Sequence, residues 1–103
     1  MIGTKSLAAA VMLMLSHSAW ADDPMRGRAL AQHMCAFCHN IRDGPRLPGR
    51  RAPSFGEVAR SVSLNASQLA IYLAFGHTPM GDRFVAIGEA GDLAAYIVSL
   101  RRR

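Results

Sequence analysis

Cys35-Ala36-Phe37-Cys38-His39 is a C-x-x-C-H run, and it is the most informative stretch of this 103-residue chain. Two cysteines three residues apart on one helical turn face the same side, and the adjacent imidazole can swing beneath whatever the thiols hold. This run is the attachment signature of a c-type haem: both thiols form thioethers with the vinyl groups, and the histidine becomes the proximal iron ligand. The run therefore predicts one covalently bound haem c, with His39 on its iron.

Three other kinds of site use a C-x-x-C pair, and the remaining sequence argues against each. A zinc site would normally need two further ligands at similar spacing, but the chain contains only two cysteines. A thioredoxin-like pair needs a preceding strand within a βαβ unit, which this sequence does not predict. A lone structural disulfide would give no reason for His39. Haem attachment is the interpretation that uses all three residues.

The N-terminus is predicted to be a secretory signal peptide. Lys5 supplies a positive charge, residues 7–15 form a short apolar stretch, and Ala19–Ala21 is an A-x-A cleavage site. The apolar stretch is shorter than the roughly 20 residues that a transmembrane helix needs. We therefore expect residues 1–21 to be removed, residues 22–103 to form one periplasmic domain, and the protein not to be stably inserted in a membrane.

The chain is basic, and almost all of its positive charge comes from arginine. Its formal net charge is +5, and basic clusters occur at Arg46, Arg50 and Arg51 and at residues 101–103. Basic runs can bind nucleic acid, but a periplasmic address argues against that partner. We expect instead that the basic loop favours an acidic docking surface on a redox protein.

Apolar spacing and capping residues predict an all-α chain with no strand. Asp23 as N-cap and Pro24 at the first position predict a helix over about 25–35, on which Leu30, Met34 and Phe37 form the apolar face. Three later helices are expected: a short one over 53–59, one from an Asn65/Gln68 capping box to Gly76, and one starting near Glu89 with Leu93, Tyr96, Ile97 and Leu100 on one face.

An iron held by His39 needs a sixth ligand, and chain position narrows the choice. The methionines and the histidine on the first helix are too near the thioethers in sequence to cross to the other face of the ring. Met80 lies in a loop 41 residues beyond His39, and its thioether is a soft ligand that commonly pairs with histidine on haem iron. We predict Met80 as the distal ligand, with His77 of the same loop as the alternative.

Taken together, these features resemble the class I cytochrome c family, the small single-haem electron carriers. The resemblance spans Gly27 to Leu100, and its parts occur in the family's order: N-terminal helix, C-x-x-C-H, Gly-Pro loop, middle helix, distal methionine and C-terminal helix. It implies the cytochrome c fold, in which three to five helices wrap one covalently attached haem and the terminal helices cross. Gly27 resembles the glycine that allows this crossing, and Tyr96 resembles its aromatic partner.

The resemblance also implies roles for residues after the haem motif. In the family a proline carbonyl accepts a hydrogen bond from the proximal histidine Nδ1, and Pro45 matches that proline. Such a bond fixes the ring tautomer and raises its basicity. We further expect Arg50 and Arg51 to contact haem propionates, because guanidinium groups bind carboxylates bidentately.

The function implied is one-electron transfer rather than catalysis. A periplasmic dehydrogenase would donate the electron, an oxidase or another cytochrome would accept it, and the carrier would be a monomer or a small heteromeric subunit. The alternative is a dedicated haem subunit of a periplasmic dehydrogenase complex, such as one that oxidises sulfite, alcohols or aldehydes. A haem enzyme or gas sensor would need an open sixth site, which Met80 disfavours.

Overall fold

The structure is a computed structural model that describes residues 22–61, 63–75, 80 and 85–102. Its elements are helices α2 (Pro24–Met34), α3 (Phe55–Ser61), α4 (Ala66–Ala74) and α5 (Ile87–Ser99), followed by the 3-10 turn η2 (Leu100–Arg102). The described residues contain no strand, so the predicted all-α fold is confirmed. Within that part of the chain, every helix is too short or too polar to span a lipid bilayer. The predicted leader, residues 1–21, lies outside the described residues.

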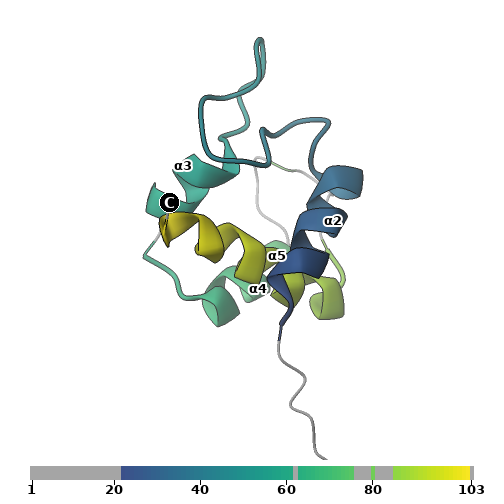
Figure 1. Ribbon diagram of the computed structural model, residues 1–103. Coiled ribbons are helices and arrows are strands. Elements are labelled where there is room, and N and C mark those ends of the chain that lie inside the picture. Colours follow the sequence, from purple (N-terminus) through teal and green to yellow (C-terminus); the bar gives the residue numbers. More distant parts are fainter. Residues whose placement is uncertain (1–21, 62, 76–79, 81–84, 103) are drawn as a thin grey trace, which may run out of the picture.

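Helix α2 crosses α5 where their backbones lie in direct contact (Figure 1). Gly27 is buried at this point, and a Cβ atom added to it would overlap the main-chain carbonyl of Asp92 and lie 2.9 Å from the Cβ of Tyr96. Because a side chain at position 27 has no room, the close crossing predicted for Gly27 and Tyr96 is confirmed. The crossing holds α2, and with it the C-x-x-C-H segment that follows, against α5.

The core lies along α5, and the predicted inward face of this helix is confirmed. Leu93, Tyr96, Ile97 and the following Leu100 are all buried. Figure 1 shows α5 in the middle of the molecule, with α2, α3 and α4 arranged around it.

The apolar face predicted for α2 is partly wrong. Leu30 packs against the core, but Met34 is 42% exposed and Phe37 is 71% exposed. The buried apolar residue of α2 is Ala31, which lies one turn after Gly27 and has no exposed surface. Met34 instead lines the large cavity beside the C-x-x-C-H run, and Phe37 lies in the turn after α2, where helical spacing no longer applies.

Local caps set the starts of α2 and α4 as predicted. The Asp23 carboxylate accepts hydrogen bonds from the backbone N–H groups of Met25 (2.9 Å) and Arg26 (3.4 Å). At α4, the Asn65 side chain accepts from the backbone of Gln68 at 2.8 Å, and the Gln68 side chain accepts from the backbone of Asn65 at 3.0 Å. These bonds satisfy N–H groups that have no partner within the helix.

The segment between α2 and α3 is tied to the core and to itself. The Tyr96 hydroxyl on α5 donates to the Ile41 carbonyl at 2.8 Å. The Phe55 N–H donates to the Asn40 carbonyl at 2.8 Å, so the start of α3 lies beside the residue that follows the C-x-x-C-H run. This pairing folds residues 40–54 into a loop whose two ends meet at His39.

Candidate haem site

A cavity of about 880 Å³ lies next to the C-x-x-C-H run. Cys35, Cys38 and His39 line it together, although they come from a turn rather than from a regular helix. Helices α3, α4 and α5 contribute apolar side chains to its wall, among them Val58, Leu73 and Leu93. A concave, mostly apolar site of this size is typical of cofactor pockets.

The turn after α2 brings the three motif residues to the cavity. The Cys35 N–H still donates to the Ala31 carbonyl at 2.9 Å, so this cysteine closes the helix. The N–H groups of Cys38 (3.1 Å) and His39 (2.9 Å) then both donate to the Cys35 carbonyl. This tight turn explains why the predicted attachment residues line one cavity.

The surroundings of the first cysteine are apolar. Burial raises the pKa of the Cys35 thiol to about 11, and the neighbouring Cys38 raises it further in the same direction. A site that disfavours thiolate favours neutral sulfur. A thioether is a neutral sulfur group, so the chemistry of the site fits covalent attachment of a haem.

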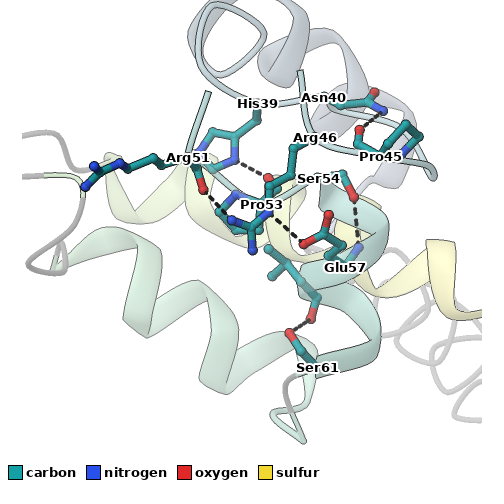
Figure 2. Close-up of polar contacts among 10 residues, drawn as sticks. His39, Asn40, Pro45, Arg46, Arg51, Pro53, Ser54, Glu57 and Ser61 are labelled. Atoms are coloured by element: carbon teal, nitrogen blue, oxygen red, sulfur yellow. Dashed lines mark hydrogen bonds and ion pairs between the residues drawn. The ribbon is translucent and has the colours of Figure 1, made fainter. Parts of the chain in front are cut away.

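The imidazole of His39 is held in one tautomer. Its Nδ1 lies 2.7 Å from the carbonyl oxygen of Pro53 (Figure 2). Since a carbonyl oxygen only accepts hydrogen bonds, Nδ1 carries a proton, and in the neutral imidazole this leaves the lone pair on Nε2. This is the tautomer in which Nε2 can bind a metal, and the hydrogen bond makes that nitrogen more basic.

The partner of Nδ1 is therefore Pro53 and not Pro45, which corrects the prediction. The Pro45 carbonyl instead accepts from the side-chain amide of Asn40 at 2.9 Å (Figure 2). The bond from the Phe55 N–H to the Asn40 carbonyl brings the residues just before α3 to His39. Sequence reasoning missed Pro53 because its signal, a proline after the haem motif, is shared by Pro45.

Aromatic packing restrains the same imidazole. The rings of His39 and Phe55 lie 5.3 Å apart between centroids at an interplanar angle of 53°. The Phe55 ring in turn lies 6.4 Å from that of Tyr96. Such tilted contacts are the preferred geometry of aromatic pairs, and they link His39 to α5 through Phe55, which is buried.

Of the remaining predicted site residues, those that the structure describes lie at the cavity. Met80, Arg50 and Arg51 line the same cavity as His39. The Arg50 guanidinium lies 4.8 Å from the centre of the exposed Phe37 ring, a cation–π contact between the loop and the C-x-x-C-H run. His77, the alternative distal ligand, lies outside the described residues. The iron and propionate roles stay predictions.

One curated relative is similar to this chain over most of its length. Cytochrome c-552 of Bradyrhizobium diazoefficiens is 41% identical over 86 residues, which cover 84% of this chain and 83% of the relative. No family model matches the sequence, and no solved structure matches it significantly. The attachment residues lie at one large cavity, and the terminal helices cross at Gly27. Together with 41% identity over most of both proteins, these features show that the chain belongs to the class I c-type cytochromes, whose cofactor is covalently bound haem c.

Proposed function

We propose that this protein is a one-electron carrier in which His39 and Met80 are the axial ligands of a haem attached through Cys35 and Cys38. The observation that carries the proposal is that both axial candidates line one cavity, with the Nε2 of His39 left free to bind metal. Bound there, haem c supplies a couple between ferric and ferrous iron that accepts and releases one electron.

The side chains around the cavity have roles that suit transfer without catalysis. The apolar wall lowers the local dielectric and keeps water from the ring, which helps to set its potential. The carbonyl of Pro53 raises the basicity of the His39 imidazole. With His39 and Met80 both bound, the iron would have no coordination site for a substrate.

Two arginines at the rim of the cavity, Arg50 and Arg51, support a role in selecting the redox partner. Arg50 and Arg51 lie at the cavity and are exposed. They are suited to pair with haem propionates and to orient an acidic redox partner, since charges at an interface act chiefly on orientation and on-rate. We place this encounter in the periplasm, after removal of the predicted leader at residues 1–21.

Ligand substitution tests the axial assignment. Met80→Ala should abolish the red absorption band that charge transfer between methionine sulfur and ferric iron produces, while the haem remains covalently attached. His77→Ala is the matched control and should leave that band in place. A Met80→Ala protein with the band intact would show that the distal ligand is a different residue.

A further inference from the structure

A hydrogen bond fixes the backbone on each side of the Pro53 carbonyl. On its C-terminal side, the Phe55 N–H donates to the Asn40 carbonyl at 2.8 Å. On its N-terminal side, the guanidinium Nη1 of Arg46 donates to the Arg51 carbonyl at 3.0 Å (Figure 2). The oxygen that meets His39 thus lies two residues from each fixed point.

The same guanidinium has a second anchor on α3. Its Nε donates to Oε2 of Glu57 at 3.1 Å, and the Glu57 N–H donates to Oγ of the buried Ser54 at 3.1 Å. Arg46 therefore bridges the loop residues just before Pro53 and the helix that follows it. A planar guanidinium can make both contacts at once from fixed donor positions, whereas a lysine ammonium is a compact point charge on a flexible stem.

We infer that Arg46 is a positioning residue for the proximal histidine: by bridging Arg51 and Glu57 it keeps the Pro53 carbonyl within hydrogen-bond reach of Nδ1, and thereby helps to set the reduction potential of the haem. The inference rests on the proposed function, because it requires an iron carried by His39. It adds a residue seven positions beyond His39, outside the C-x-x-C-H run.

The direction of the effect follows from the bond it protects. A strong Nδ1–H···O bond makes the imidazole a better electron donor, which stabilises ferric iron and lowers the potential. Loss of the bridge weakens this bond and raises the potential. The positive charge of Arg46 acts with the opposite sign, because removing a cation near the haem favours ferric iron and lowers the potential. The Arg46 side chain is 53% exposed, so solvent weakens that direct charge effect.

The test uses the haem-bearing protein with Arg46→Gln and Arg46→Lys, each measured for midpoint potential and for solvent exchange of the His39 Nδ1 proton by NMR. Both variants should raise the potential and exchange this proton severalfold faster. Arg60→Gln is the control. Arg60 also forms an exposed ion pair, with Asp43 at 2.6 Å, and its side chain is 48% exposed. Its loss removes the same charge and keeps both hydrogen bonds of Arg46, to the Arg51 carbonyl and to Glu57, so it should not raise the potential or speed the exchange.

Two outcomes would overturn the inference. A lower potential in Arg46→Gln with an unchanged one in Arg46→Lys would mean that only the charge acts. Unchanged potential and exchange with a lower unfolding midpoint would mean that Arg46 is merely structural. If Arg46→Gln fails to fold, Glu57→Gln weakens one anchor; because loss of this anion raises the potential by charge alone, the readout is exchange of the His39 Nδ1 proton. This exchange should become faster, and an unchanged exchange rate would overturn the inference. Failure of the proposed function is separate, because the unsubstituted protein would then lack the methionine–iron band.

Discussion

Gly27 and Tyr96 meet at the crossing of α2 and α5, where an added Cβ would overlap the main chain of α5 rather than a side chain that can move. Gly27→Ala should therefore destabilise the folded protein by about 3 kcal/mol, the upper part of the usual range for overpacking. Guanidinium unfolding of the haem-bearing protein measures this change.

Gly88→Ala is the matched control for that substitution. Gly88 lies in the first turn of α5, and an added Cβ would meet nothing within 4 Å. Alanine there should be neutral or stabilise the protein by up to about 1 kcal/mol, through helix propensity. Equal losses at both positions would contradict the steric account of the crossing.

Tyr96 offers a second test, because its buried hydroxyl donates to the Ile41 carbonyl at 2.8 Å. Tyr96→Phe removes this bond and leaves a carbonyl without its partner, which should cost about 1–3 kcal/mol. Urea unfolding should show the loss, while the methionine–iron band of the folded protein stays unchanged. An unfolding midpoint equal to that of the unsubstituted protein would show that the hydroxyl does not hold the loop to α5.

Helix α4 depends on a reciprocal cap between Asn65, the residue before its first turn, and Gln68. Asn65→Ala removes the side chain that accepts from the Gln68 N–H and should cost about 1 kcal/mol of stability. Hydrogen exchange of the α4 amides should speed up most in the first turn. Ser67→Ala changes an exposed residue of the same turn and should not destabilise the helix; a loss as large as that of Asn65→Ala would argue against the cap.

The predicted helix starts are right where the sequence analysis identified a capping residue, whereas α3 begins at Phe55, two residues after its predicted start. The starts of α2 and α4 were correct because the capping contacts join residues at most three apart, which a local pattern can report. Helix α5 begins at Ile87, two residues before the predicted start, and its N-cap Ala86 makes no side-chain cap bond. With no capping residue, the sequence carries little signal for where this helix begins.

The surplus of positive charge should govern encounters across the protein surface. Residues 22–103, which remain after removal of the predicted leader, have eleven arginines and seven acidic residues, a formal net charge of 11 − 7 = +4 before the haem propionates. Oxidation of the ferrous protein by anionic ferricyanide should therefore slow as ionic strength rises, through screening of the attraction. The double substitution of Arg50→Gln and Arg51→Gln should reduce this salt dependence, as measured by stopped-flow absorbance.

The control for that experiment is a pair of arginines away from the cavity. Arg28 and Arg42 line a separate, smaller pocket beside α2, and changing both to glutamine removes the same charge. If positive charge steers ferricyanide towards the haem cavity, changing Arg28 and Arg42 should reduce the salt dependence of the oxidation rate by less than changing Arg50 and Arg51. An equal loss of salt dependence would mean that net charge alone governs the encounter, with no preference for the rim formed by Arg50 and Arg51.

The haem attachment run, the two capped helix starts and the buried face of α5 could be predicted because each depends on residues within a few turns of one another. The partner of His39 could not. Pro45, Pro48 and Pro53 all follow the haem motif, and each has a carbonyl that could accept a hydrogen bond. Pro53 reaches the ring because Asn40 pairs with Phe55 while Arg46 bridges to Arg51 and Glu57. The surroundings of Met34 and Phe37 could not be predicted either. Helix α2 ends at Met34, so Phe37 lies in the following turn, and Met34 lines the cavity that forms only where α3, α4 and α5 meet that turn. A periodic pattern within one segment reports neither fact, because both depend on contacts between segments far apart in the sequence.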